Sequence, residues 1–197
     1  MDFGKFAAGY LAELKAVLDG FETDRFTDLV EALLEAYEHN NNVFIMGNGG
    51  SGSTASHFVC DLNKGCCLDL PQKFKVTCLN DNLPSLLAYA NDLSYESVFV
   101  EQLKNFFNEG DLVIGISGSG NSENVLRAIH YARENGGKTA GISGYAGGKL
   151  ADRVDIPFVV RVDDMQKVED VHMIVVHMIM QAVYAKLHPG DEAGKPC

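Results

Sequence analysis

The chain has 197 residues, of which 46% are hydrophobic and 22% are charged, and its formal net charge is −11 at pH 7. This length suffices for one domain with a substantial core, or for a domain with helical additions. No run approaches about eighteen uninterrupted apolar residues, so we expect no membrane span. The acidic balance argues against nucleic acid as the main partner, because phosphate backbones need a basic face.

The N-terminus and the cysteines indicate a cytoplasmic protein. The first residues include acids and no long apolar segment, which is not the pattern of a secretory signal. The five cysteines are odd in number and form no CxxC pair. A reduced setting therefore fits best, and neither a zinc ribbon nor a disulfide framework is expected. Cys197 is expected to be an exposed residue without function.

Two helices are predicted between about Gly4 and Asn40, because apolar residues recur there at helical spacing. Thr23 or Asp24 is expected to cap the second of them. These helices precede the first strand and have no sheet partner of their own. They therefore pack on another subunit, cover the site, or pack on their own domain.

Five short apolar runs follow, separated by helical patterns, which predicts an α/β fold with a parallel sheet covered on both faces. The expected strands are Val43–Met46, Phe74–Leu79, Leu112–Ile116, Thr139–Ile142 and Ile156–Val160. The expected helices are Thr54–Gly65, Leu83–Asn91, Glu96–Phe107, Glu123–Asn135 and Met165–Leu187. Ligands in such sheets bind beyond the carboxyl ends of the strands.

The first strand leads into a turn of small residues at positions 47–53, where the backbone can approach a ligand closely. A strand, a glycine turn and a helix N-terminus form a common anion-binding arrangement, although many such turns only reverse the chain. His57 and Asp61 lie four residues apart in the helix that follows, and so on one face of it. They are placed to meet the same ligand, or a metal beside it.

The third strand repeats this plan with the sequence DLVIGISGSGNS at positions 111–122. Ser117, Ser119 and Ser122 place three hydroxyls around glycines at a helix N-terminus, which favours a phosphate cradle made without Lys or Arg. The alternative is a simple helix cap. The glycine-rich segment 141–148 is interpreted only as a turn. No P-loop and no complete dinucleotide fingerprint is present, so no nucleotide cofactor is expected.

Several of these motifs together resemble the sugar isomerase (SIS) domain family. They are Gly47–Ser51 with His57, Asn91-Asp92 followed by Tyr95-Glu96, Gly115–Ser122, and the late segment Glu169–His177. Within that family the chain resembles the phosphoheptose isomerase branch, which converts sedoheptulose 7-phosphate to D-glycero-D-manno-heptose 7-phosphate. The likeness runs from the N-terminal helices to about Leu187.

The resemblance implies a single SIS domain, a flavodoxin-like three-layer sandwich, at positions 41–188. The N-terminal helices at 1–40 would serve in assembly of a homotetramer, and 189–197 is expected to be a mobile tail. The resemblance also implies that the serine loop holds the phosphate and that the first turn and Asn91-Asp92 bind the sugar. These substrate-binding positions are Asn48, Gly49, Gly50, Asn91, Asp92, Ser117, Gly118, Ser119 and Ser122.

Four further positions match the family's zinc ligands, namely His57, Asp61, Glu169 and His177. The family has His, Glu, Gln and His there, and the second and fourth residues also act as general acid and base. Here Asp61 is one methylene shorter than Glu, and Glu169 carries a charge where Gln is neutral. Two His and two carboxylates still form a sound set for a first-row metal, with zinc as the leading candidate. Glu169 is an alternative base.

Three functions follow from this reading. The first is a sugar-phosphate isomerase that works through an enediol(ate), for which carboxylates and His suit the proton transfers and a metal stabilises the developing charge. The second is an isomerase of another ketose phosphate. The third is a non-catalytic SIS protein that binds a sugar phosphate or a partner protein. His172, three residues after Glu169, competes with His177 for a role in the site.

Overall fold

The chain, seen in a computed structural model that describes residues 1–190, is built on one five-stranded parallel sheet with the order β2-β1-β3-β4-β5. The strands are β1 (Asn42–Gly47), β2 (Lys75–Cys78), β3 (Leu112–Ser117), β4 (Lys138–Gly144) and β5 (Ile156–Val160). All four neighbouring pairs are parallel. This is the flavodoxin-like strand order, which confirms the predicted fold class.

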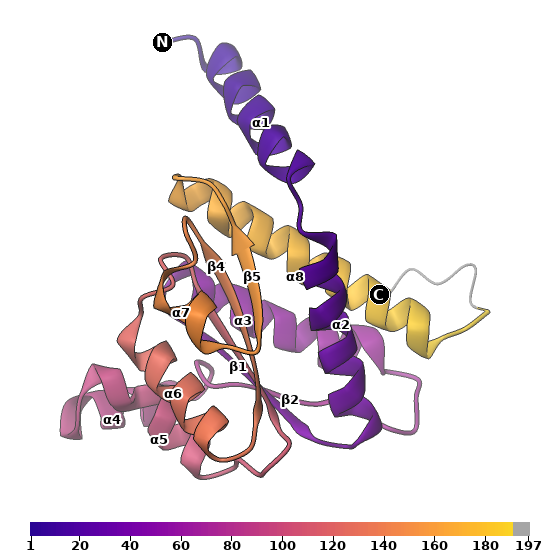
Figure 1. The fold of residues 1–197 in the computed structure, drawn as a ribbon, viewed down its shortest axis with the longest axis vertical. Helices are drawn as coiled ribbons and strands as arrows, with labels where there is room; N and C mark the ends of the chain where they lie inside the picture. Colours follow the sequence, from indigo (N-terminus) through magenta and orange to yellow (C-terminus); the bar gives the residue numbers. More distant parts are fainter. Residues whose placement is uncertain (191–197) are drawn as a thin grey trace.

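Helices cover both faces of the sheet (Figure 1). They are α1 (Phe3–Asp19), α2 (Thr23–Glu38), α3 (Gly50–Cys60), α4 (Leu83–Asp92), α5 (Val98–Lys104), α6 (Glu123–Glu134), α7 (Gly148–Arg153) and α8 (Met165–Leu187). A π-helix, η1 (Asp61–Cys66), continues α3, and a 3-10 turn, η2 (Tyr95–Ser97), precedes α5. No helix of the described residues is long and apolar enough to cross a membrane.

Alternate residues of the strands divide the core into two layers, because successive side chains of a strand point to opposite faces. Val43 and Ile45 of β1 face α2, α3 and α8. Phe44 and Met46 face α5, α6 and α7. The near-continuous apolar strands are therefore those of a sheet buried on both sides, as the sequence predicted.

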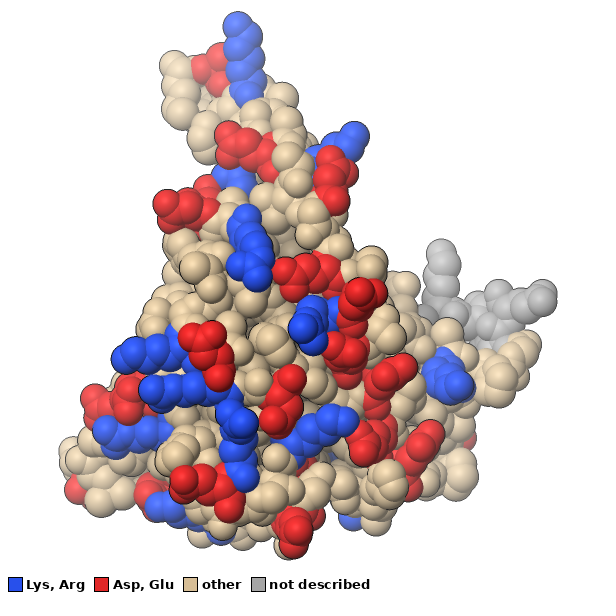
Figure 2. Space-filling view, in the orientation of Figure 1, with Lys and Arg blue, Asp and Glu red and all other residues tan. Residues whose placement is uncertain are grey.

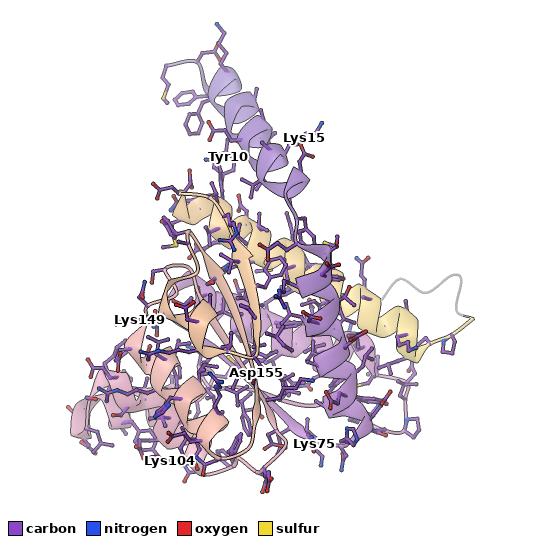
Figure 3. The ribbon with its side chains drawn as sticks, in the orientation of Figure 1. Tyr10, Lys15, Lys75, Lys104, Lys149 and Asp155 are labelled. Atoms are coloured by element: carbon purple, nitrogen blue, oxygen red, sulfur yellow. The ribbon has the colours of Figure 1, made fainter. Side chains whose placement is uncertain are left out.

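The two N-terminal helices differ in how they use their apolar residues. Helix α2 buries Leu29, Ala32, Leu33 and Ala36 in the core, whereas α1 has no buried residue. Figure 1 shows α1 extending away from the rest of the chain. Its link to α8 includes Tyr10, labelled in Figure 3, and the hydroxyl of Tyr10 donates a 2.5 Å hydrogen bond to Asp170. Acidic and basic side chains are interspersed over the face in Figure 2.

Three local predictions are wrong. Helix α3 begins at Gly50 rather than Thr54, and the segment predicted to be only a turn ends in α7, which starts at Gly148. Neither Thr23 nor Asp24 is the N-cap of α2, because the cap position falls on Glu22 and makes no side-chain bond. Positions 191–197, which make up all but the first two residues of the predicted mobile tail at 189–197 and include Cys197, lie outside the described residues.

Candidate active site

The two predicted ligand turns lie side by side at the carboxyl end of the sheet. Gly47, the last residue of β1, pairs with Ile116 of β3, one residue before that strand ends at Ser117. Neighbouring strands are about 4.8 Å apart, so the turns that leave them start as neighbours. The fold thus joins the glycine turn and the serine loop into one edge, as expected for a sheet of this order.

The serine loop is formed by neutral hydroxyl groups and backbone donors. The hydroxyls of Ser117 and Ser122 lie 3.0 Å apart, Ser117 is buried, and Ser119 is exposed. Ser122 occupies the N-cap of α6 but makes no side-chain capping bond, so its hydroxyl is not used to close the helix. Hydroxyls and the uncapped N–H groups of a helix N-terminus are suited to an anion.

Helix α8 runs past the serine loop, the glycine turn and the histidine of α3 in turn. A Cβ on Gly118 would lie 2.5 Å from Sδ of Met165, the first residue of α8. A Cβ on Gly50 would collide with the carboxylate of Glu169, four residues further along. His177, eight residues beyond Glu169, meets His57 of α3. Glu169 therefore lies at the glycine turn, between the serine loop and the histidines.

His57, Asp61 and His177 form one cluster between α3, η1 and α8. The Nε2 atoms of the two histidines are 2.9 Å apart, and Oδ2 of Asp61 lies 3.3 Å from Nε2 of His57. Their three candidate ligand atoms all fall within 4.8 Å of one another. The packing of α3 against α8 thus brings together residues that are 120 positions apart in the chain.

This cluster fits a zinc ion. Oδ2 of Asp61 is buried and receives no hydrogen bond within the described residues, although it lies near a histidine. Two ligands on a tetrahedral zinc at about 2.0–2.1 Å are themselves about 3.3 Å apart, close to the spacing of the two Nε2 atoms. Three protein ligands with a fourth position open are the usual set of a catalytic zinc. Glu169 stands outside the cluster, and its metal role stays a prediction.

The predicted sugar-binding residues lie in two groups. Asn48 accepts a 2.7 Å hydrogen bond from the hydroxyl of Tyr95 in η2, and it pairs with Asn124 at the start of α6. Gly49, beside it, has a φ of +54°, a conformation that glycine adopts without strain. Asn91 and Asp92, exposed at the end of α4, hydrogen-bond to each other at 2.8 Å.

Comparison with known proteins gives the family. The SIS domain model matches residues 9–144. A phosphoheptose isomerase of Helicobacter pylori strain P12 is 34% identical over 176 residues, which cover 88% of this chain and 91% of the relative. One from Clostridium acetobutylicum is 33% identical over 176 residues, with 89% of each chain covered. This chain belongs to the SIS domain family, in its phosphoheptose isomerase branch.

This chain has the same fold as a solved structure from that branch. The phosphoheptose isomerase of Neisseria gonorrhoeae superposes with a TM-score of 0.85 at 24% identity, and the match covers 92% of this chain and 98% of that one. At this level of identity the likeness shows the shared fold alone. It confirms a single α/β domain whose parallel sheet is flanked by helices.

His172 lies in a different environment from the SIS-family positions on α8. It is 1% exposed, and its Nε2 lies 3.1 Å from the carbonyl oxygen of Ser143 in β4. Burial lowers the pKa of its imidazole to about 4, so the ring stays neutral at ordinary pH. His172 thus packs α8 against the sheet, and His177 is the histidine that reaches the cluster.

The sequence did not predict a role for Asn124, and Tyr95 was identified only as part of the SIS-family motif Tyr95-Glu96. Both contact Asn48, and Asn124 is only 2% exposed. Asn124 lies two residues after Ser122, inside what the sequence presents as an ordinary helix start. A buried polar group must find a partner, but this Asn is buried only by the packing of α6, so the sequence carried no local signal for the contact.

Proposed function

We propose that this chain is an aldose–ketose isomerase that converts sedoheptulose 7-phosphate to D-glycero-D-manno-heptose 7-phosphate. Relatives named phosphoheptose isomerase match this chain over nearly their full length. The observation that carries the proposal is the cluster of His57, Asp61 and His177, which a protein that only binds its ligand has no need to keep. The serine loop supplies the remote handle for the phosphate.

The residues suit the proton transfers of an enediol(ate) reaction. A base must take a proton from one of two adjacent carbons and a proton must return to the other, for which a carboxylate and an imidazole are suitable groups. Asp61 and His177 are the proposed acid and base, and Glu169 is the carboxylate nearest the glycine turn. Zinc held by the cluster would stabilise negative charge on the substrate oxygens. Binding of the phosphate holds the reacting carbons in place.

Helix geometry supports a site shared between two copies. Met165 beside the serine loop and His177 are twelve residues apart on α8, or about 18 Å along the axis. The substrate has eight bonds of about 1.5 Å between phosphorus and C1, so it extends roughly 10 Å. The separation along α8 thus exceeds the length of the substrate, which favours a site built from two copies. We propose that the cluster of one copy faces the serine loop and Glu169 of another, which would complete the four-residue metal set.

Helix α1 is the proposed contact between copies in a homotetramer. Phe3, Phe6 and Leu11 are 77%, 59% and 64% exposed, and an exposed apolar row of this kind usually marks an interface. Replacing Phe6 and Leu11 with Asp should lower the mass measured by light scattering and leave the core intact, because α1 gives the core no buried residue. An unchanged mass would remove α1 from the interface.

The first experiment measures isomerisation and the sharing of sites together. Purified protein is incubated with sedoheptulose 7-phosphate, and aldose formation is followed. His177→Ala and Ser122→Asp copies are then tested alone and after joint refolding. Each alone should be inactive, whereas random pairs should recover about a quarter of the parent activity, since half are hybrids with one intact site of two. No recovery would place each site within one chain.

A second candidate, an isomerase of another ketose phosphate, is favoured by two departures from the family pattern, the shorter side chain of Asp61 and the added charge of Glu169. Extra negative charge near the sugar changes which hydroxyl pattern is tolerated. Competition between sedoheptulose 7-phosphate and shorter ketose phosphates decides between the two. Turnover of none of them by zinc-loaded protein would favour the non-catalytic binding protein.

We place the protein in the cytoplasm. Cys60, Cys66, Cys67 and Cys78 are all free thiols. Burial raises the pKa of the Cys66 and Cys78 thiols to about 12, so both stay protonated and unreactive. Free thiols of this kind suit a reducing compartment.

A further inference from the structure

Asn48 and Asn124 form a reciprocal amide pair across the two ligand turns. Nδ2 of Asn48 donates to Oδ1 of Asn124 at 2.9 Å, and Nδ2 of Asn124 donates to Oδ1 of Asn48 at 2.9 Å. Asn48 is half-buried in the turn after β1, and Asn124 is 2% exposed in the first turn of α6. The pair therefore joins the glycine turn to the serine loop through two side chains.

The backbone fixes which way both amides point. The N–H of Val125 donates a 2.9 Å hydrogen bond to Oδ1 of Asn124, and a backbone N–H can only donate. This partner therefore decides which atom of the Asn124 amide is the oxygen and which is the nitrogen. The amide of Asn48 must present its oxygen to Nδ2 of Asn124, and this oxygen also accepts the hydroxyl of Tyr95 at 2.7 Å.

These contacts leave Asn48 with one unused hydrogen-bonding group. A side-chain amide has two acceptor sites on oxygen and two N–H donors. Asn124 and Tyr95 occupy both acceptor sites, and Oδ1 of Asn124 takes one N–H. The second N–H of Asn48 remains. It points away from the pair, because the two hydrogens of an amide lie on opposite sides of the nitrogen.

We propose that Asn124 and Tyr95 are positioning residues, which fix the Asn48 amide so that its remaining N–H donates to an oxygen of the substrate's sugar portion. This inference rests on the proposed function. Asn124 lies two residues after Ser122, in the first turn of α6. The same helix start therefore positions both the serine loop and, through the amide pair, the N–H of Asn48 that would donate to the sugar. Tyr95 adds a third segment, η2, to the same amide. The ligand group must be an acceptor, such as a hydroxyl or carbonyl oxygen.

The test uses the Asn48→Ala background. Tyr95→Phe and Asn124→Leu, a neutral change to a side chain of similar shape, are each made in the parent and in Asn48→Ala, and kcat and KM for sedoheptulose 7-phosphate are measured. In the parent each should raise KM about tenfold, the effect of one hydrogen bond to a neutral group. In Asn48→Ala the same changes should alter KM less than twofold, because the group they orient is gone. Equal effects in both backgrounds would overturn the proposal.

A second measurement separates positioning from general damage. Inorganic phosphate engages only the serine loop, so its affinity should stay within twofold in Tyr95→Phe and the neutral Asn124→Leu while that of the sugar phosphate falls. Asn42→Ala is the matched control. Asn42 also donates its amide, to both oxygens of Asp111, but at the opposite end of β1. It should lower stability and leave both affinities unchanged. A parallel loss of both affinities in Asn124→Leu would overturn the positioning role.

The geometric step can be judged even if the parent turns over no sugar phosphate. In a crystal structure of Asn124→Asp, the carboxylate would face Oδ1 of Asn48, and two acceptors repel each other. The amide of Asn48 should then rotate and lose the 2.7 Å contact with Tyr95. An Asn48 left in place in that structure would show that Asn124 does not orient it, whatever the enzyme's substrate proves to be.

Discussion

The serine loop and the histidine cluster are opposite kinds of binding region within one fold. The loop offers hydroxyls and backbone N–H groups at the start of α6, and Ser122 leaves that helix without a side-chain cap. The cluster offers two imidazole nitrogens 2.9 Å apart and a buried carboxylate oxygen that receives no hydrogen bond from residues 1–190. One region offers donors that suit an anion, and the other offers ligand atoms that suit a cation.

The difference teaches that each region's ligand can be read from what it leaves unsatisfied. Unpaired donors at a helix start stabilise negative charge. Unpaired acceptors that face one another repel until a cation lies between them. A single sugar phosphate can bind both regions only if its phosphate reaches the serine loop while its sugar end reaches the cluster. Because the two regions of one chain are about 18 Å apart along α8, we expect two copies to form one site.

The largest effect is expected from breaking the cluster. His177→Ala removes a zinc ligand and a proposed acid–base group, so kcat should fall about 10³-fold or more and tight zinc binding should be lost. The measurement is turnover together with chelator competition for zinc. His39→Ala, at an exposed histidine that caps α2, is the control and should behave as the parent. Substantial activity in His177→Ala would separate the cluster from the reaction.

Breaking the anion region should have a smaller effect of a different kind. Ser122→Ala removes a hydroxyl that would contact a charged phosphate, so phosphate affinity should fall about tenfold to a hundredfold while zinc affinity stays the same. Calorimetric titration with inorganic phosphate and with zinc measures both. Ser97→Ala is matched to it, because Ser97 forms the same kind of hydroxyl pair with Ser94 at 3.1 Å. A change in zinc affinity alone would contradict the division of roles.

A weaker effect is expected at Glu169, which lies between the two regions. Glu169→Gln keeps the shape and removes one negative charge, so zinc affinity in the assembled protein should fall roughly three- to tenfold, the effect of a partly solvated charge contact. The same variant diluted until the copies separate should bind zinc as the diluted parent does. Equal zinc affinity of variant and parent in the assembled state would exclude Glu169 from the shared metal set.

The smallest effect on activity belongs to His172, and its signature is in stability. Its folded pKa of about 4 lies below the ordinary value of 6.5, so the unfolded chain binds the proton first as the pH falls. Stability is fully present above pH 6.5 and should decline by up to about 3 kcal/mol towards pH 4. His172→Gln does not titrate, so its free energy of unfolding, measured with urea, should change less with pH across this window. Its turnover at neutral pH should be unchanged. If the stability of the variant depended on pH as steeply as that of the parent, the loss of stability would be due to other groups.

The sequence predicted the layers of the fold because its signals there are local. All five strands fall where the apolar runs place them, since a sheet buried on both faces needs continuous apolar residues. The start of α3 was missed because Gly50 and Gly52 have poor intrinsic helix propensity, which packing overrides. Helix α7 was missed because six residues are too short for a periodic signal.

The site could be predicted only in part. His57 and Asp61 are one helical turn apart, so their shared face follows from spacing. That His177 meets them depends on how α3 packs against α8, for which the sequence has no local signal. The amide pair of Asn48 and Asn124 is likewise a contact between distant segments. Glu169 was expected in the metal set, and in the single chain it lies at Gly50 instead.

The hydrogen bonds of Asn48 also bear on how this protein ages. Asn48 is followed by Gly49, and an Asn before glycine is chemically fragile, because the small neighbour lets its backbone nitrogen attack the side-chain carbonyl and release ammonia. An amide held by Asn124 and Tyr95 has little freedom to turn towards that nitrogen. The same contacts that aim the group should therefore slow its conversion to a carboxylate during storage.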